Sequence, residues 1–332
     1  MYLVTGGAGF IGSNVVAALA RRGARVVVDD TFGCEDKWRN VAKHDVYDFI
    51  TPAELDGWLE ANARSSQRSA VEGVIHMGAI SATTERDSDL IVASNFQLSC
   101  KLWQWCSRNE VPFIYASSAA TYGDGTEGFS DRFEAEVLGS QLPLNPYGWS
   151  KLAFDRRVYR DVNDGELAPP KWAGLRFFNV YGPNEYHKGS MRSVIAVNMP
   201  KLVAGDPMRL FRSYRNDYRD GEQKRDFVYV KDCVSVILWM LDNQFPSSIY
   251  NVGSGRARTW LDLGRAMMKA GKIEERFEFI DMPETLRERY QYFTEANSEK
   301  LRRAGYQAAF YSLEDGVADY VENYLLKPDP FA

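Results

Sequence analysis

Tyr147 and Lys151 are the two residues whose types and spacing most directly indicate chemistry. Four positions apart on a helix, the phenol and the ammonium lie on one face. The cation can lower the pKa of the phenol and orient a ribose, and the phenol can then act as a general acid or base on an alcohol or a ketone. Ser118, within a run of small residues that follows an apolar segment, is expected to bond the reacting oxygen. The spacing alone is common in helices, so this interpretation depends on the rest of the chain.

A glycine-rich segment at residues 5–12 supplies that context. Its sequence, TGGAGFIG, places Gly6, Gly9 and Gly12 between a predicted strand and a predicted helix. Glycines at this spacing allow a tight turn, a close approach of the backbone to a pyrophosphate, and packing of the helix on the strand. The segment therefore predicts a dinucleotide-binding site.

Charged residues after the second predicted strand bear on which dinucleotide is bound. Asp29 and Asp30 stand where a carboxylate would accept hydrogen bonds from the adenosine ribose, which favours NAD. Lys37 and Arg39 follow in the same loop and could offset the repulsion of a 2′-phosphate. These residues leave NAD and NADP open.

An alternating series of elements must position these groups. Apolar, β-rich runs predict strands at 2–5, 25–30, 71–77, 112–116 and 172–178, and amphipathic patterns predict helices near 10–22, 52–64, 87–109, 147–163 and 312–326. This alternation is typical of a parallel α/β sheet. The long polar segments at 179–190 and 212–225 are candidates for the substrate side, and the Ser/Arg-rich residues 64–69 are expected to form a solvated loop.

Composition restricts the class of protein. The 332 residues are 45% hydrophobic and 26% charged, which excludes extended disorder and suggests two domains or one large one. The formal net charge of −5 argues against nucleic acid or an anionic membrane as a partner.

The four cysteines and the apolar runs add further limits. The cysteines are scattered without a CxxC pair, so no metal site or disulfide framework is expected, and they are predicted to be buried reduced thiols. No apolar run reaches the roughly 18 residues of a membrane span, and the predicted location is cytoplasmic.

Four strings, TGGAGFIG, YASSAATYG, YGWSK and LRFFNVYGPNE, resemble the extended short-chain dehydrogenase/reductase superfamily of nucleotide-sugar epimerases, dehydratases and reductases. The resemblance implies a Rossmann-type doubly wound parallel sheet with a smaller C-terminal α/β substrate domain. The implied cofactor domain spans 1–177 and 226–253, and the substrate domain 178–225 and 254–327. The dehydratases of this superfamily carry Thr-Asp-Glu where this chain has Ser-Ala-Ala at 118–120, so dehydration is disfavoured.

Three further segments, 184–191, 224–230 and 289–294, are similar to those of the ADP-glycero-manno-heptose 6-epimerases. The resemblance implies inversion at C6 of ADP-D-glycero-D-manno-heptose through a transient 6-keto sugar, for the inner core of lipopolysaccharide. It also implies a tightly bound NADP, with NAD as the alternative. The family uses two acid/base groups, which fall on Tyr147 and Lys188.

The resemblance also implies the remaining site residues. Catalytic roles fall on Tyr147, Lys188, Lys151 and Ser118. Cofactor contacts fall on Gly6, Gly9, Phe10, Ile11, Gly12, Asp29, Asp30, Lys37, Gly78, Ala79, Ile80, Ser81, Asn95, Tyr147, Lys151, Val180 and Lys188. Substrate contacts fall on Ser118, Asn179, Ser190, Phe211, Arg225 and Tyr290.

Two of the basic groups have alternative interpretations. A guanidinium at Arg225 can fork onto a diphosphate, and the alternative is an ion pair with Asp226 or Asp232. His76, at the end of a predicted strand, is expected to be packed and hydrogen-bonded rather than catalytic.

The chain departs from the family pattern in three places. Asp30 replaces an Asn that is frequent there, which weakens the NADP assignment. A polar insertion at 212–223 replaces a short turn and leaves contacts to the sugar or nucleotide undecided. Pro52 lies near a position where the family can offer a cofactor-binding lysine.

Two other functions remain open on the sequence. The first is another nucleotide-sugar epimerase, such as a UDP-hexose 4-epimerase, in which Tyr147 acts alone. The second is a non-catalytic dinucleotide-sensing regulator. Such proteins can lose the tyrosine or the lysine, so the presence of Ser118, Tyr147 and Lys151 argues against this function. Self-association is also expected, with a pentamer as the size implied by the family. The Trp-rich helix around 102–105 is a candidate interface, unless it is core.

Overall fold

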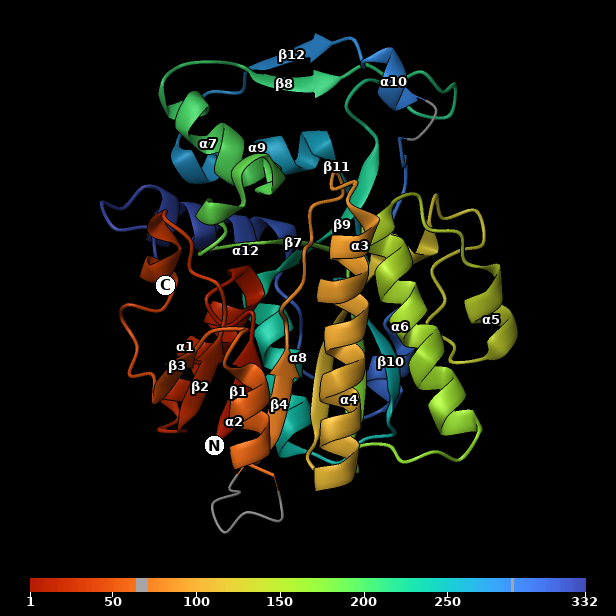
Figure 1. The fold of residues 1–332 in the computed structure, drawn as a ribbon. Helices are drawn as coiled ribbons and strands as arrows, with labels where there is room; N and C mark the ends of the chain where they lie inside the picture. Colours follow the sequence, from red (N-terminus) through yellow and green to blue (C-terminus); the bar gives the residue numbers. More distant parts are fainter. Residues whose placement is uncertain (64–70, 288–289) are drawn as a thin grey trace.

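The structure is a computed structural model that describes residues 1–63, 71–287 and 290–332. The loop expected at 64–69 and residue 289 lie outside the described residues. A seven-stranded parallel sheet with the order β10-β6-β5-β4-β1-β2-β3 forms the centre of the molecule (Figure 1). Its strands are β1 (Tyr2–Thr5), β2 (Val26–Asp29), β3 (Asp48–Ile50), β4 (Gly73–His76), β5 (Phe113–Ser118), β6 (Trp172–Phe177) and β10 (Ser248–Val252).

Helices cover both faces of this sheet (Figure 1). They are α1 (Phe10–Arg21), α2 (Leu55–Ala61), α3 (Ser88–Ile91), η2 (Val92–Gln97), α4 (Leu98–Asn109), α5 (Ala135–Ser140), α6 (Pro146–Asn163), α8 (Val230–Asp242) and α11 (Glu299–Arg303). Strands such as β2 and β4 are buried along their whole length, which explains why apolar residues lead up to the polar residue that ends each of them, Asp29 and His76. The Rossmann-type fold class predicted from the sequence is confirmed.

A smaller region lies beyond the carboxyl ends of the sheet strands (Figure 1). It contains the parallel pair β8 (Met208–Phe211) and β12 (Phe277–Ile280), and the helices α7 (Val194–Val203), α9 (Trp260–Gly271), α10 (Glu284–Arg287) and α12 (Leu313–Tyr320). A three-stranded sheet of β7 (Asn179–Tyr181), β9 (Lys224–Tyr229) and β11 (Ala257–Thr259) connects it to the larger sheet. Short helical turns complete the chain: η1 (Asp36–Asn40), η3 (Ala119–Tyr122), η4 (Tyr186–Met191) and η5 (Val321–Leu325).

The elements follow the predicted ranges with a few differences. The short edge strand β3 was not predicted, and the helix predicted at 52–64 is only α2, Leu55–Ala61. The residues before α2 form a turn instead, because the Glu54 carboxylate accepts hydrogen bonds from both the amide and the hydroxyl of Thr51. The helix predicted at 87–109 is continuous, but its middle part, η2, is a π-helix.

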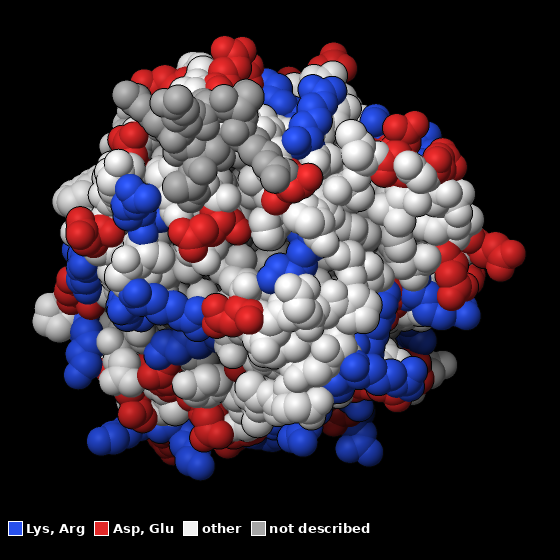
Figure 2. All heavy atoms as spheres, turned by 90° about the horizontal axis from the view of Figure 1, so that it is seen from below, with Lys and Arg blue, Asp and Glu red and all other residues white. Residues whose placement is uncertain are grey.

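The strand order places a topological switch point beside β1. The chain passes from β1 to β2 on one side, and β4 lies on the other, so the loops after β1 and β4 flank a crevice. Ligands of open α/β sheets bind in such a crevice. The opposite end of the molecule, seen in Figure 2, carries basic and acidic side chains intermixed rather than one basic patch.

The cysteine prediction is partly wrong. Cys106 and Cys233 are buried thiols, but Cys100 is only half-buried and Cys34 is exposed. All four are free. Cys34 lies in the loop after β2, where no apolar layer covers the chain. Within the described ranges, no helix is long and apolar enough to cross a membrane.

Candidate active site

A cavity of about 490 Å³ opens at the switch point. Its walls come from the loops after β1, β2, β4 and β5, from α6, and from the segment that follows β6. Its lining residues are Gly6, Gly9, Phe10, Ile11, Gly12, Asp30, Lys37, Met77, Gly78, Ala79, Ile80, Ser81, Ala82, Ala116, Ser117, Ser118, Tyr147, Lys151, Phe177, Phe178, Val180, His187, Lys188 and Met191. Most of the predicted cofactor and catalytic residues therefore line one cavity.

The glycine loop forms the floor of this cavity and fits a dinucleotide. Gly6 has a φ of +63°, and a Cβ there would lie 2.5 Å from the Gly78 amide nitrogen. A Cβ on Gly12 would lie 2.1 Å from the Gly6 carbonyl oxygen. Gly9 caps α1 without a side-chain hydrogen bond, which leaves the amides of the first turn available to a phosphate. Phe10 and Ile11, the first residues of α1, line the cavity beside them.

The two acidic residues after β2 occupy different environments. Asp30 lines the cavity and accepts hydrogen bonds from the Ala8 amide (2.9 Å), the Thr31 amide (2.7 Å) and the Lys37 ammonium (2.5 Å). Asp29 lies behind it with 3% of its surface exposed. Burial, and secondarily the charge of Asp30, raises the pKa of Asp29 to about 7.

Asp29 gives a second indication that a ligand fits here. Among the described residues, its Oδ1 atom has no hydrogen-bond partner. A buried carboxylate oxygen without a partner is unfavourable, and a ribose hydroxyl is a group that would satisfy it.

The loop after β4, residues 78–81, forms another wall. Asn95 is fully buried on η2 and does not line the cavity; its side chain accepts from the Ile80 amide (2.8 Å) and donates to the Ile80 carbonyl (3.0 Å). His76 is packed as predicted, between Thr5 (2.6 Å) and Ser99 (2.8 Å), and burial lowers its pKa to about 3. Both residues therefore support the loop from behind.

Helix α6 presents Tyr147 and Lys151 to the cavity. It begins with Pro146, and the Asn145 side chain caps it by accepting from the Gly148 amide (2.8 Å). Burial raises the pKa of Tyr147, and a hydrogen bond with Ser118 opposes that effect. Lys151 is itself buried, which lowers its pKa to about 8.

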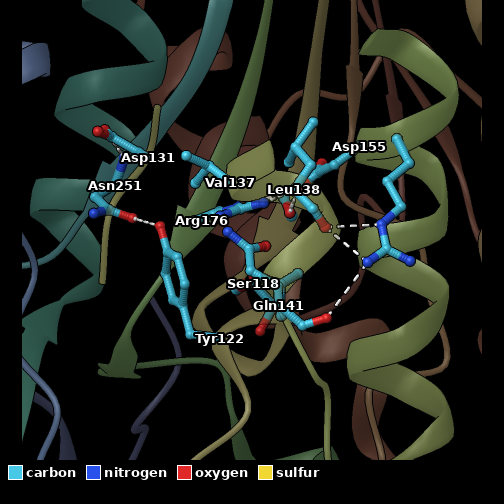
Figure 3. A network of polar contacts seen from close by, with 12 residues as sticks. Ser118, Tyr122, Asp131, Val137, Leu138, Gln141, Asp155, Arg176 and Asn251 are labelled. Carbon is cyan, nitrogen blue, oxygen red and sulfur yellow. Dashed lines mark hydrogen bonds and ion pairs between the residues drawn. The ribbon is translucent and has the colours of Figure 1, made fainter. Parts of the chain in front are cut away.

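A buried polar network holds α6 against the end of β5 (Figure 3). Asp155, one turn beyond Lys151, pairs with Arg176 at 2.8 Å, and both side chains have no exposed surface. The carboxylate of Asp155 also accepts from the hydroxyls of Tyr115 (3.0 Å) and Ser117 (2.9 Å). Because Ser117 precedes Ser118, this network fixes the serine relative to the tyrosine and lysine of α6.

Lys188 reaches the same cavity from η4. Its ammonium lies 5.3 Å from the centre of the Phe10 ring, and burial lowers its pKa while the nearby Glu185 opposes that effect. Glu185 has no exposed surface and accepts hydrogen bonds from Ser193 (2.7 Å, through its hydroxyl) and Tyr320 (3.0 Å). The lysine is therefore carried by an anchored turn rather than by a free loop.

Arg225 lies on β9, outside the lining of that cavity, with 7% of its surface exposed. Its guanidinium lies 5.2 Å from the centre of the Tyr290 ring and 5.8 Å from that of Trp260. The expected alternative role is not observed, because Asp226 accepts from Ser254, Gly255 and Ala296 while Asp232 accepts from Tyr311. Within the described ranges, no carboxylate pairs with Arg225. The guanidinium donates to the Lys224 carbonyl at 2.8 Å, and a buried cation that has no counter-ion among the described residues indicates a site for an anion.

The other predicted substrate contacts do not all lie at one place. Phe211 ends β8 and meets the Tyr290 ring at 6.1 Å. Asn179 and Ser190 are exposed, on β7 and η4. The structure therefore gathers Arg225, Tyr290 and Phe211 at one place and leaves Asn179 and Ser190 nearer the solvent.

The polar insertion at 212–223 packs on Tyr292. The Tyr214 amide donates to the Tyr292 hydroxyl (3.0 Å), and the Tyr218 ring lies 5.3 Å from the Tyr292 ring. Tyr292 in turn meets Tyr290 at 5.4 Å. The insertion thus supports the aromatic wall beside Arg225.

Several site residues were not predicted. His187 lines the cavity next to Lys188, and burial, with Lys37 and Lys188 nearby, lowers its pKa to about 4. Trp260 donates to the Tyr290 hydroxyl at 3.0 Å and forms one wall around Arg225. His187 stands two positions after the YGPNE string and could have been noted there, whereas the local sequence around Trp260 does not indicate a site residue.

Comparison with known proteins gives the family. Residues 2–253 match the model of the NAD dependent epimerase/dehydratase family. The ADP-L-glycero-D-manno-heptose-6-epimerases of Fusobacterium nucleatum and Nitratidesulfovibrio vulgaris (strain DP4) are 45% and 48% identical to this chain, and each match covers 100% of both chains. The crystal structure of the enzyme of that name from Helicobacter pylori aligns with a TM-score of 0.77 at 27% identity over 97% of this chain and 95% of the other. This chain belongs to the NAD dependent epimerase/dehydratase family.

Proposed function

We propose that this protein is a nucleotide-sugar epimerase that inverts C6 of ADP-D-glycero-D-manno-heptose through a transient 6-keto sugar. The observation that carries the proposal is the presence of two proton-transfer groups, Tyr147 and Lys188, on separate elements of one cavity. The full-length similarity to relatives named for this reaction supports the choice of substrate.

The chain's own groups have distinct roles in the reaction. Tyr147, which is hydrogen-bonded to Ser118, removes the proton from the C6 hydroxyl. Lys151 orients both the cofactor ribose and the phenol of Tyr147. When bound, the nicotinamide ring supplies a reversible hydride acceptor. After the ketone reorients, Lys188 donates its own proton to the C6 oxygen as hydride adds to the other face, and exchange with solvent then returns Tyr147 and Lys188 to their starting protonation states. The lowered pKa of Lys188 suits this exchange, because an acid/base group works best near the ambient pH.

Arg225 binds the diphosphate of the substrate. A guanidinium can donate two parallel hydrogen bonds to phosphate oxygens, and this one lies between Trp260 and Tyr290 without a competing carboxylate among the described residues. The aromatic rings restrict the orientation of the guanidinium and exclude water from it.

The cofactor is a tightly held NADP, with NAD as the alternative, and the Asp30–Lys37 pair selects between them. Lys37 neutralises Asp30 and lies at the cavity wall, so its ammonium is placed to bind a 2′-phosphate. Without that lysine, an unpaired carboxylate at Asp30 would accept both ribose hydroxyls of NAD. Because epimerisation returns the hydride to the molecule that lost it, the purified protein should carry its cofactor.

Product separation after incubation with ADP-D-glycero-D-manno-heptose and, in parallel, with UDP-glucose tests the proposal. The expected result is conversion of the heptose at C6 without added cofactor, and no conversion of UDP-glucose. Conversion of UDP-glucose alone would establish a 4-epimerase, and steady-state consumption of added NADH would establish a net reductase.

Self-association and a cytoplasmic location remain predictions. Leu102 and Trp103 of the proposed interface helix α4 are core residues, and Trp105 donates to the Leu59 carbonyl at 2.9 Å. An interface would therefore have to use other residues. Light scattering at micromolar concentration measures the assembly, and a strict monomer would end this part of the proposal.

A further inference from the structure

The last residues of the described chain pack on two turns that border the cofactor cavity. Residues 329–332, here called the tail, follow η5 and lie beside η1 (Figure 1). The Phe331 side chain is only 6% exposed. The tail is therefore held in place by the residues that surround it.

One set of contacts joins the tail to η1 and the residues after it. The Arg39 guanidinium lies 4.3 Å from the centre of the Phe331 ring. Lys43 donates to the Phe331 carbonyl at 2.6 Å. The Asp329 carboxylate pairs with Lys43 at 3.0 Å and with Arg39 at 3.7 Å. This side of the contact combines a cation–π interaction with charge pairs.

A second set joins the tail to the turn that carries Lys188. The Tyr186 ring meets the Phe331 ring edge to face at 5.2 Å, and its hydroxyl donates to the Pro330 carbonyl at 2.8 Å. The Ala332 amide donates to the Asn184 side chain at 2.9 Å. Phe331 is thus packed between Arg39 of one turn and Tyr186 of the other.

The two turns carry cavity residues on their opposite sides. Lys37, two positions before Arg39, lines the cavity, and so do His187 and Lys188, which follow Tyr186. Two direct contacts join the turns: the side chains of Asn40 and His187 meet at 3.2 Å, and the Asn184 side chain donates to the Asn40 carbonyl at 3.3 Å. The tail covers the outer side of this junction.

We propose that the tail is a strap that keeps η1 and η4 together and thereby retains the bound dinucleotide. This inference rests on the proposed function, since it assigns Lys37 and Lys188 to the cofactor site. Asp329 and Phe331 are positioning residues, because they act through the two turns and do not line the cavity. Without the strap, cofactor binding must supply the free energy that orders both turns.

Phe331→Ala tests the strap, with Leu326→Ala as the matched control. Leu326 is 44% exposed and lies just before the tail. The dissociation constants of NAD and NADP are measured by fluorescence titration, and amide hydrogen exchange is followed at 36–40 and 186–191 in the cofactor-free protein. Phe331→Ala should weaken binding of the preferred dinucleotide about tenfold and accelerate exchange in both turns, because the turns are no longer pre-ordered. Leu326→Ala should change neither.

Asp329→Asn provides a milder second variant if Phe331→Ala does not fold. Asp329 is 51% exposed, and its replacement removes the charge pairs but leaves the ring in place. A two- to threefold weakening, about what an exposed pair contributes, is expected at low salt and should diminish at high salt. Unchanged binding in both variants, or faster exchange confined to the tail, would overturn the strap. A wild-type protein that binds neither dinucleotide would refute the proposed function, and the exchange measurement would still report whether the tail links the turns.

Discussion

The glycine loop around Gly6 and the cluster around Arg225 are both proposed to hold a diphosphate, yet they are built differently. The first offers backbone amides at the start of α1 and contains no cation. The second offers a buried guanidinium between two aromatic rings, without a carboxylate partner among the described residues. Without a ligand, free amides at a helix terminus destabilise the protein little, because water can bind them. A buried charge without a partner destabilises it considerably. The glycine loop is therefore pre-organised for its ligand with little loss of stability. The Arg225 cluster is most stable when its ligand is bound.

The largest expected effect concerns the groups between the two phosphate sites. Tyr147→Phe and Lys188→Met should each reduce epimerisation by about 10²–10⁴-fold, because each removes the acid/base group for one face of C6. Both variants should keep the fold and cofactor. With a 6-aldehydo analogue, which can be both oxidised and reduced, one variant can retain dismutation, because each half-reaction needs only one base. Near-normal epimerisation by Lys188→Met beside an inactive Tyr147→Phe would contradict the two-base scheme and favour a 4-epimerase.

The next prediction concerns Asp29, a buried carboxyl on the cofactor side. Its pKa in the fold is about 7, above the usual 3.8, so its contribution to stability is complete below pH 3.8 and is lost as the pH rises through 7. The cofactor-free Asp29→Asn variant cannot titrate. It should therefore be more stable than wild type at pH 8, by a free energy on the order of 3 kcal/mol, and close to wild type at pH 4.5.

Thermal unfolding at the two pH values measures this difference. The exposed Asp45→Asn is the matched control and should change the free energy of unfolding little at either pH. The same Asp29→Asn variant should bind the dinucleotide more weakly, because the ribose loses its acceptor. An equal stability difference at pH 4.5 and pH 8 would show that Asp29 is already satisfied without the cofactor.

The cofactor side could be predicted from the sequence because its residues lie close to strand ends. Gly6, Asp30 and Gly78 each follow a sheet strand within a few positions, and the parallel order brings such ends together. Tyr147 and Lys151 lie on one helix, so their spacing in the sequence was enough to predict that they face the same side. The local sequence pattern did not reveal how deeply each of these side chains is buried. The burial that raises the pKa of Tyr147 is an example.

The substrate side could be predicted only in part. Arg225 and Tyr290 came from the resemblance, but Trp260 and the packing of the insertion on Tyr292 depend on contacts between distant segments. The tail contacts join residues 144 to 288 positions apart in the Tyr186–Pro330 and Lys43–Phe331 hydrogen bonds. Periodicity reports on neighbours along a strand or helix and carries no information about such pairs.

Arg225→Met tests the cost of the buried charge on the substrate side. The KM for the nucleotide-sugar should rise about 100-fold, because a hydrogen bond from a buried guanidinium to phosphate is lost. The ligand-free variant should be at least as stable as wild type, since it removes a buried cation that has no carboxylate partner among the described residues. The exposed Arg209→Met, which breaks only a surface pair with Glu278, should change neither quantity. Strong destabilisation by Arg225→Met would instead assign the arginine a purely structural role.

The smallest expected effect is a change in cofactor preference on replacing Lys37. In Lys37→Met the Asp30 carboxylate loses its ammonium partner, so it should repel a 2′-phosphate and accept the hydroxyls of an unmodified ribose. We expect the dissociation constant of NADP to rise about tenfold while that of NAD stays level or falls, because one charge-assisted hydrogen bond is worth about that much. Lys101→Met breaks a comparable pair with Asp56 on the protein surface and is the control. If wild type already prefers NAD and Lys37→Met leaves both constants unchanged, the lysine serves only to neutralise Asp30, and selection rests on the carboxylates alone.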